Sequence, residues 1–168
     1  MTNLDKLIIS AALFEKIRQH AVEDYPHECC GALLSRDSNS LPEQQRPREI
    51  LDLFPLINRN GESPRNRFSV SPQDVIDAER AAGERGLEIV GWYHSHPDHP
   101  ARPSEFDREH AWPWYSYLIV SVRERVPQET TSWRLNDDRG AYSEEVIEIV
   151  AVRLNDVESQ GVKTNHGR

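Results

Sequence analysis

Apolar and polar residues at the start of the chain follow two spacings in turn, and each spacing predicts one element. Residues 7–9 form a short apolar run that predicts a strand. Ser10 is a candidate helix cap, and apolar residues then recur at steps of three and four as far as Val22. This period places them on one face of a helix. Pro26 ends the helix, because a proline restricts the residue before it to extended conformations.

The alternation of apolar runs and polar segments continues through the rest of the chain. Helices interspersed among strands predict an α/β domain in which helices pack on a sheet. The sheet is expected to be mixed, because the last strands lack intervening helices and are typical of a meander. The predicted strands are residues 29–34, 50–57, 87–94, 115–122, 130–135 and 146–152, the helices are residues 71–86 and 104–112, and the loops are residues 36–48 and 58–67.

Length and composition are those of one folded domain. The 168 residues include 37% apolar and 29% charged residues, and a chain of this length buries a sizeable core. We therefore expect a single domain over residues 1–155. Residues 156–168 are polar and contain glycine, and they predict a flexible tail.

Charge and hydropathy argue against two classes of partner. The net charge of −8 disfavours nucleic-acid binding, because phosphate contacts need clustered Lys and Arg. No apolar run approaches the roughly 20 residues that span a bilayer. The start of the chain also lacks the basic residues and apolar core of a secretory signal, so we expect a cytoplasmic protein that binds no membrane. The oligomeric state is not predicted.

The chain contains two cysteines, Cys29 and Cys30, which are neighbours. Adjacent cysteines suit neither the disulfide framework of a secreted fold nor a structural zinc knuckle. We interpret both as small apolar residues of a buried strand. A redox role, or a place in the lining of an active site, is the alternative.

The most informative segment runs from Gly91 to Asp107 and reads GWYHSHPDHPARPSEFD. His94 and His96 are two residues apart, so on a strand both imidazoles point to the same face. Asp107 follows a proline-broken turn and can fold back as a third ligand, whereas His99 lies in that turn and is a poorer candidate. Two histidines and a carboxylate suit a catalytic zinc ion with its fourth position left to water. A pair of structural histidines is the alternative.

Ser104 and Asp107 also have a structural interpretation. Ser-x-x-acid is a helix capping arrangement, so these residues start a helix. The two interpretations are compatible, because a helix whose first turn faces a metal can offer Asp107 as a ligand and Ser104 as a donor to developing negative charge.

A zinc hydrolase also needs a base that takes a proton from water and hands it to the leaving amine. Asp98 and Glu105 are close in sequence, but they are expected on a turn and on a helix surface. Glu28 lies just before a predicted buried strand, where a solvated glutamate is less expected. From the residues alone the choice among these three stays open.

Taken together, these residues resemble the JAMM (MPN-plus) zinc metallopeptidases. The family pattern is a glutamate, a long gap, His-Ser/Thr-His-Pro and then Ser-x-x-Asp. Here it is matched by Glu28, residues 94–97 and residues 104–107. The flanking segments, including Arg67–Pro72, look similar too, so the resemblance covers roughly residues 5–150.

The resemblance implies a cytidine-deaminase-like α/β sandwich with one zinc ion per chain. By position in the motif, His94, His96 and Asp107 would bind the zinc. Glu28 would be the general acid/base, and Ser104 would stabilise the tetrahedral oxyanion.

The short connection at residues 112–114 resembles the small stand-alone prokaryotic members of the family. Several of these cleave beside the Gly-Gly tail of ubiquitin-like or sulfur-carrier proteins, which implies such a carrier as partner and substrate. Its tail could pair with a sheet edge near the metal. Arg59, Arg65 and Arg67 are candidate contacts to an acidic carrier, with a solvated loop face as the alternative.

Two other functions stay open at this point. One is a non-catalytic protein-binding scaffold of the same fold, and the other is a zinc hydrolase of small amides.

Overall fold

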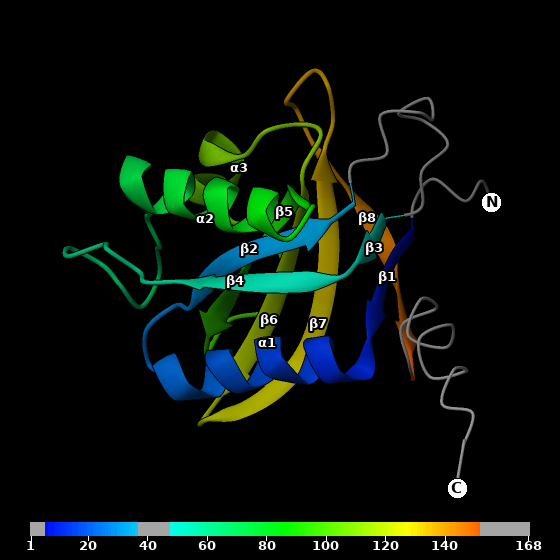
Figure 1. Ribbon diagram of the computed structural model, residues 1–168. Helices are drawn as coiled ribbons and strands as arrows, with labels where there is room; N and C mark the ends of the chain where they lie inside the picture. Colours follow the sequence, from blue (N-terminus) through cyan, green and yellow to red (C-terminus); the bar gives the residue numbers. More distant parts are fainter. Residues whose placement is uncertain (1–5, 37–47, 152–168) are drawn as a thin grey trace, which may run out of the picture.

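A strongly bent sheet of eight strands is the frame of the molecule (Figure 1). This computed structural model describes residues 6–36 and 48–151. The helices are α1 (Ala11–Asp24), α2 (Pro72–Glu84) and α3 (Glu105–His110). The strands are β1 (Lys6–Ser10), β2 (Cys30–Ser35), β3 (Arg48–Ile50), β4 (Asp52–Leu56), β5 (Glu88–Pro97), β6 (Ser116–Arg123), β7 (Val126–Leu135) and β8 (Tyr142–Val150).

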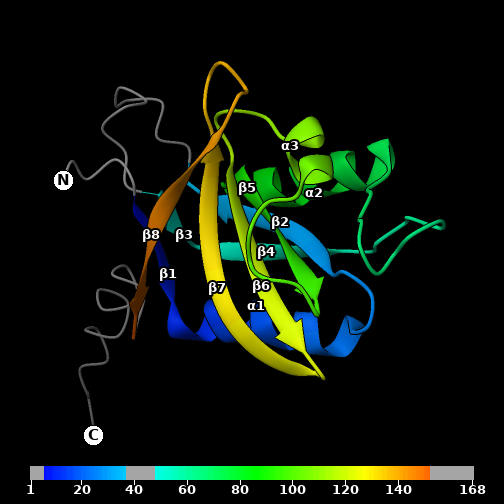
Figure 2. The same ribbon diagram turned by 180° about the vertical axis from the view of Figure 1, so that it is seen from behind.

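The strand order is β3-β1-β8-β7-β6-β5-β2-β4. β1 is parallel to β3 and β8, and β5 is parallel to β6, whereas the other pairs are antiparallel. β8 pairs with β7 over residues 142–145 and with β1 over residues 146–150, so it changes partner midway. β3 and β4 stand at opposite ends of the order, yet Leu51 alone separates them in the chain. The two ends of the sheet therefore meet, and the sheet curves around one core (Figures 1 and 2).

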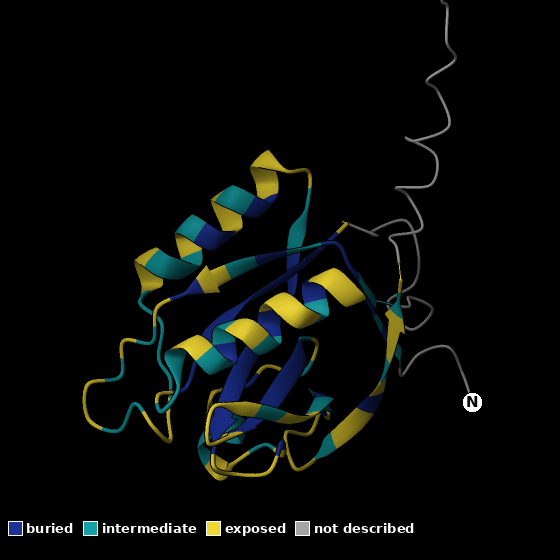
Figure 3. Ribbon diagram, turned by 90° about the horizontal axis from the view of Figure 1, so that it is seen from below, coloured by how far each residue is buried: buried dark blue, intermediate teal, exposed yellow. Residues whose placement is uncertain are grey.

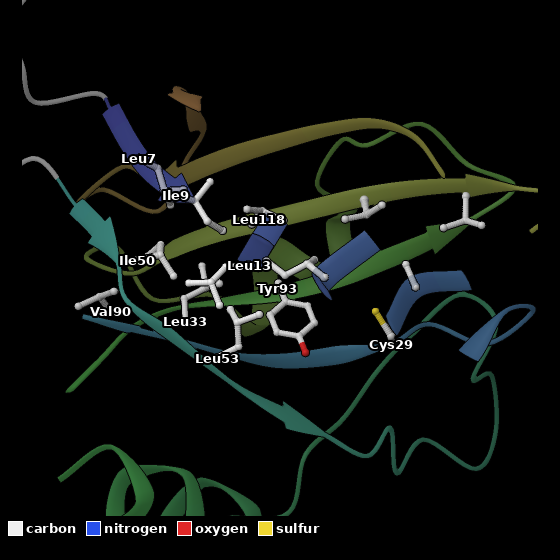
Figure 4. Packing of buried hydrophobic residues seen from close by; sticks show 14 residues of the cluster. Leu7, Ile9, Leu13, Cys29, Leu33, Ile50, Leu53, Val90, Tyr93 and Leu118 are labelled. Atoms are coloured by element: carbon white, nitrogen blue, oxygen red, sulfur yellow. The ribbon is translucent and has the colours of Figure 1, made fainter. Parts of the chain in front are cut away.

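The main core lies between the sheet and α1. The Ser10 side chain caps this helix by accepting a hydrogen bond from the backbone N–H of Leu13 at 3.2 Å. Leu13, Ile17 and Ala21 share the buried face of α1, and the opposite face is exposed (Figure 3). The sheet contributes side chains from several strands to the same cluster (Figure 4), among them Leu7, Ile9, Leu33, Ile50, Leu53, Val90, Tyr93 and Leu118.

α2 and α3 lie on the other side of the sheet from α1 (Figure 1). Ser71 and Asp74 form a capping box at the start of α2, with Pro72 in its first turn, and the helix begins where the sequence predicted it. Ala78 and Ala82 pack α2 against the sheet in a second, smaller cluster. Side chains alternate along β5, so neighbouring residues face opposite sides of the sheet. Tyr93 faces the α1 core, whereas Trp92 and His94 face the side of α2.

Four predicted strands need correction. The strand predicted at residues 50–57 is two strands, because the backbone N–H of Leu51 bonds to the carbonyl of Leu34 and the chain changes partner there. β5 continues beyond the predicted end at residue 94 to Pro97, because its pairing with β6 extends that far, and the two histidines lie in its last four residues. β7 and β8 begin earlier than predicted, at Val126 and Tyr142, because strand pairing continues to those points.

The prediction of an α/β fold with a mixed sheet and flanking helices is confirmed. The cytidine-deaminase-like sandwich and the single domain over residues 1–155 stay predictions. The tail predicted at residues 156–168, and most of the loop at residues 36–48, lie outside the described residues. Within the described ranges, the helices are too short or too polar to cross a bilayer.

Candidate metal centre

β5 presents the two histidines side by side on its α2 face. The Nε2 atoms of His94 and His96 are 3.1 Å apart, and both side chains are buried. Ser95 points the other way, and its hydroxyl accepts a hydrogen bond from the backbone N–H of Cys29 at 2.8 Å. The alternation predicted for an extended strand is therefore confirmed. Ser95, which lies between the two histidines, also joins β5 to Cys29, directly before β2.

The connection from β5 to β6 brings Asp107 over these histidines. A parallel strand pair requires a crossover, and here the crossover contains α3. Asp107 Oδ2 is 3.2 Å from the Nε2 of His96, and Asp107 Oδ1 is 3.4 Å from the Nε2 of His94. Ser104 and Asp107 also form a complete capping box at the start of α3. The capping arrangement and the approach to the histidines therefore occur together, within residues 94–107.

Glu28 reaches the same point from a distant part of the chain. Its backbone N–H bonds to the carbonyl of Pro64 at 2.8 Å, and its carbonyl accepts from the Asn58 side chain at 3.1 Å. Its Oε1 atom is 3.8 Å from the Nε2 of His96. Only 1% of Glu28 is exposed, and neither carboxyl oxygen has a hydrogen-bond partner among the described residues. Such an orphaned carboxyl marks a position that a metal-associated group would satisfy.

Burial, together with the nearby charge of Asp107, raises the pKa of Glu28 to about 9 in the protein without a metal. Burial lowers the pKa of His94, although Asp107 opposes this effect. Burial also opposes ionisation of Asp107, but the two histidines outweigh it and hold the pKa of this carboxyl well below its usual range. The Nδ1–H of His96 donates to the carbonyl of Pro100 at 2.8 Å, and this bond fixes the ring with its Nε2 facing Asp107 and His94.

The donor atoms fit a small tetrahedral metal ion. Around a metal with bonds of 2.0–2.1 Å, two ligand atoms lie about 3.3 Å apart. The separations among His94, His96 and Asp107 are 3.1, 3.2 and 3.4 Å. The fully buried group of potential ligands is Glu28, His94 and His96, whose ligand atoms lie within 4.8 Å of one another. Asp107 lies closer to the two histidines than Glu28 does. Of the two carboxylates, Glu28 is therefore the one farther from the histidine Nε2 atoms.

The other acidic candidates have different partners. Asp98 accepts a hydrogen bond from the Tyr25 hydroxyl at 2.8 Å, and Glu105 forms an ion pair with Arg108. His99 is on the exposed turn, where its ring contacts the side chain of Asn66 at 3.3 Å. None of these residues joins the group around His94 and His96.

Both cysteines are buried, which confirms their interpretation as small apolar residues of the core. Burial raises the pKa of both thiols, to about 12 for Cys30, so neither is a ready thiolate at neutral pH.

Two cavities flank the centre, and sequence reasoning identified few of their residues. A cavity of about 380 Å³, called here the aromatic cavity, is lined by Phe68, Ser69, Val70, Val75, Trp92, His94, Phe106, Asp107, His110, Trp112, Tyr115 and Tyr117. A cavity of about 320 Å³, called here the cationic cavity, is lined by Glu28, Arg65, Asn66, His96, His99, Pro100, Arg102 and Ser104. Their linings come from separate segments. Apart from the motif residues, the sequence analysis had pointed to Arg67–Pro72 through the family resemblance, to Arg65 as a candidate carrier contact and to His99 as a poorer ligand candidate.

Fold and site together define an α/β protein with a buried cluster of histidines and carboxylates that could hold a metal ion. The chain belongs to the prokaryotic homologues of the JAB domain, a family that matches it over residues 10–136. It is 36% identical over 126 residues to the desampylase of Haloferax volcanii, an alignment that covers 72% of this chain and 84% of that protein.

Two further comparisons extend over more of the chain. The CysO-cysteine peptidase of Mycobacterium tuberculosis is 30% identical over 145 residues, which cover 86% of this chain and 91% of the relative. The solution structure of a protein from Desulfitobacterium hafniense superposes with a TM-score of 0.73 at 30% identity, and covers 89% of this chain and 96% of that one. The relatives whose names state an activity are peptidases, so this family is one of hydrolases.

Proposed function

We propose that this chain is a zinc-dependent peptidase. Its substrate would be a small ubiquitin-like or sulfur-carrier protein, cleaved at the peptide or isopeptide bond next to the C-terminal Gly-Gly tail. The observation that carries the proposal is the convergence of His94, His96 and Asp107 beside the buried carboxyl of Glu28. The names of the relatives, a desampylase and a CysO-cysteine peptidase, support the substrate class.

In this proposal His94, His96 and Asp107 hold the metal. Two imidazoles and one carboxylate are a common ligand set of catalytic zinc, which is why zinc is proposed over other divalent ions. A bound zinc ion supplies Lewis-acid polarisation of the scissile carbonyl and lowers the pKa of water to about 7.

Glu28 would act as the proton carrier. Among the described residues its carboxyl has no hydrogen-bond partner that would compete for a substrate proton, and its Oε1 lies 3.8 Å from the Nε2 of His96. It takes a proton from the attacking water and gives it to the leaving amine. A bound cation favours the ionised form of this carboxyl and so brings its pKa down from the raised value of the metal-free protein.

Ser104 would donate a hydrogen bond to the oxyanion. Its Oγ already accepts the backbone N–H of Asp107 at 3.0 Å, and this bond leaves the hydroxyl proton free for a further acceptor. A donor fixed in advance by a capping box needs little reorganisation during the reaction.

The carrier tail would lie along Phe68–Val70. This segment borders the aromatic cavity, and the backbone groups of Phe68 and Val70 make no hydrogen bond within the described ranges. An extended, side-chain-poor tail can pair with such a segment as an added strand.

The test uses the zinc-loaded protein and the sulfur-carrier proteins of its own genome, each extended past Gly-Gly. We expect cleavage after Gly-Gly that a chelator abolishes. Failure to cleave any of these carriers would contradict the proposed substrate. Turnover of small amides alone would favour the small-amide alternative, and a protein that binds no zinc would favour the scaffold.

The matched variants for this test are Glu28→Gln and Glu105→Gln. Glu28→Gln should bind zinc and lose about 10²–10⁴-fold in rate, the usual contribution of a general acid/base. Glu105 is an exposed glutamate on the neighbouring helix and pairs with Arg108, so its variant should keep the wild-type rate. Wild-type cleavage by zinc-bound Glu28→Gln would contradict the role assigned to Glu28.

A further inference from the structure

The three proposed metal ligands are held by the fold in different ways. His94 and His96 lie on β5, which pairs with β2 on one side and with β6 on the other. Asp107 lies on α3, a helix of six residues of which none is buried. In a folded protein most of the stability of a helix comes from the packing of its apolar face. The position of Asp107 therefore depends on contacts of another kind.

The crossover that contains α3 is anchored before and after the helix. Ala101 and Ala111, which flank it, are both buried. The backbone N–H of Trp112 donates to the hydroxyl of Tyr117 at 2.7 Å. Between these anchors the helix has no buried side chain, so contacts from neighbouring segments determine how far Asp107 lies from the histidines.

The turn between β7 and β8 lies against α3 (Figures 1 and 2). Arg139 Nη2 donates to the carbonyl of Glu109 at 3.5 Å, and the guanidinium of Arg139 lies 5.6 Å from the centroid of the Trp112 ring. The carbonyl of Arg139 accepts a hydrogen bond from Arg108 Nη1 at 3.3 Å. One residue of the turn therefore contacts both the last part of α3 and the connection that follows it.

Hydrogen bonds within the turn make it a firm support. The backbone N–H of Asn136 donates to the carbonyl of Ala141, and that of Arg139 donates to the carbonyl of Asn136, both at 2.8 Å. The side chain of Asn136 also accepts a hydrogen bond from the Ser143 hydroxyl at 2.8 Å. Arg139 is therefore fixed by its own hairpin and can in turn hold α3.

A second arginine contacts α3 from the β4–α2 loop. The guanidinium of Arg67 lies 4.7 Å from the centroid of the Phe106 ring. Arg67 directly precedes Phe68–Val70, which the proposed function assigns to the carrier tail, so a variant of Arg67 would alter two properties at once. Arg139 lines neither the aromatic nor the cationic cavity, and its variants report on the metal centre alone.

We propose that Arg139 is a positioning residue of the metal centre. By holding α3 over β5, it keeps the carboxylate of Asp107 at 3.2 and 3.4 Å from the histidine Nε2 atoms, the separations that suit a tetrahedral ion. Arg139 acts through Asp107 and does not contact the ion. The inference rests on the ligand set of the proposed function. Groups that orient a metal ligand typically change metal affinity 10–100-fold when they are removed.

The experiment measures the dissociation constant for zinc by competition with a chromophoric chelator. Arg139→Ala should bind zinc about tenfold more weakly than the wild type, at the low end of the usual range because the contacts of Arg139 are exposed. Its Tm in chelator should equal that of the wild type, because no core contact is removed. Arg139→Lys should recover most of the affinity, since a lysine also places a cation over Trp112 and an N–H donor near the carbonyl of Glu109.

Arg125 offers a matched control in the turn between β6 and β7. Arg125 and Arg139 both have a left-handed backbone, with φ of 64° and 61°. The guanidinium of Arg125 lies 5.8 Å from the centroid of the Tyr25 ring, much as that of Arg139 lies over Trp112. Alanine keeps the Cβ atom, so both alanine variants retain the same backbone strain. Arg125→Ala should keep the zinc affinity of the wild type.

The outcomes separate this inference from the proposed function. A wild type that does not bind zinc, or an Asp107→Ala variant with wild-type affinity, would overturn the proposed ligand set and the inference with it. If Asp107→Ala loses zinc while Arg139→Ala keeps the wild-type affinity, the inference fails and the peptidase proposal stands. The inference also fails alone if Arg125→Ala loses as much affinity as Arg139→Ala, or if Arg139→Ala lowers the Tm in chelator together with the affinity.

Discussion

Glu28 occupies a position that weakens the metal-free protein. A carboxyl that is 1% exposed and has no hydrogen-bond partner among the described residues loses its hydration on folding and gains nothing in return. The raised pKa of Glu28 is the direct result. A group with this property is typical of functional sites, where stability is given up for reactivity.

This cost predicts a pH-dependent gain for Glu28→Gln in the metal-free protein. The folded-state pKa of about 9 lies above the unfolded value, so above about pH 4.5 folding requires Glu28 to retain a proton that the unfolded chain has released. The contribution of Glu28 to the free energy of unfolding of the wild type is therefore greatest below the unfolded pKa and falls as pH rises towards the folded pKa. The Tm advantage of Glu28→Gln in chelator should grow between pH 5 and pH 8. A difference that does not change with pH would contradict the buried, protonated carboxyl.

Ser104 combines a structural and a chemical role, and a second serine allows the two to be separated. Ser71 forms the same capping box at the start of α2, away from the metal ligands. Ser104→Ala and Ser71→Ala should each lose about 1 kcal/mol of stability as caps. Ser104→Ala alone should also lose about 10²-fold in kcat, as the removal of an oxyanion donor does. Thermal unfolding and steady-state kinetics on both variants check this, and equal kcat values would rule out the oxyanion role.

At the scale of elements, the β4–α2 loop is held to α2 by one ion pair. Both Arg59 Nε and Nη2 bond to the Asp74 carboxylate, at 2.7 and 3.0 Å, and Asp74 also belongs to the capping box of α2. The hydrogen bond from Arg59, followed by those from Ser71, keeps the pKa of Asp74 well below its usual range. The ion pair therefore fixes the segment that leads to Phe68 and the aromatic cavity.

Breaking this pair should affect substrate binding more than chemistry. Arg59→Ala should raise KM for a carrier severalfold and leave kcat nearly unchanged. Arg59 is not a proposed ligand and lines neither of the two cavities, so it has no direct role in the chemical step. The folded-state pKa of Asp74 is depressed, so its stabilising effect is present above the unfolded carboxyl pKa of about 3.9 and is lost only as pH falls through the lower folded value. The rise in KM should consequently be the same from pH 5 to pH 8. A fall in kcat with KM unchanged would contradict this positioning role.

The elements that the sequence predicted well are those specified by nearby residues. Ser10 and Ser71 cap their helices through hydrogen bonds to residues three positions on. The placement of His94 and His96 on one face of β5 follows from the two-residue period of a strand. The choice of the partner strand, in contrast, depends on residues far away in the sequence. The break at Leu51 depends on a hydrogen bond to Leu34 across the sheet, and no local pattern contains that information.

The site shows the same division between local and distant information. The segment from His94 to Asp107 could be predicted as a candidate metal site from spacing, whereas Glu28 required the family resemblance, because its position depends on the pairing of β2 with β5. Arg102 drew no attention in the sequence, since an exposed arginine next to a proline has no distinguishing pattern. Only the packing of two separate segments makes it part of a cavity.

For the whole molecule, a bound metal should connect the helix layer to the sheet. The proposed ligands come from β5 and from α3, which lies over it. Zinc that binds only the folded chain stabilises it by RT ln(1 + [Zn]/Kd), about 4 kcal/mol at 1,000 times Kd. We therefore expect a zinc-dependent rise in Tm for the wild type and for Glu28→Gln, and none for Asp107→Ala. A full rise in Asp107→Ala would exclude Asp107 as a ligand.

The three proposed ligands lie within residues 94–107, whereas the proposed proton carrier, Glu28, lies in the connection between α1 and β2. One short stretch of the gene therefore encodes the capacity to bind metal, and a single codon far upstream adds the capacity for hydrolysis. A change in that codon would leave the three proposed ligands and the helix cap of α3 in place. Descendants of such a protein can therefore pass from enzyme to inert binding protein in one mutational step, and return by its reversal, without passing through an unfolded intermediate sequence.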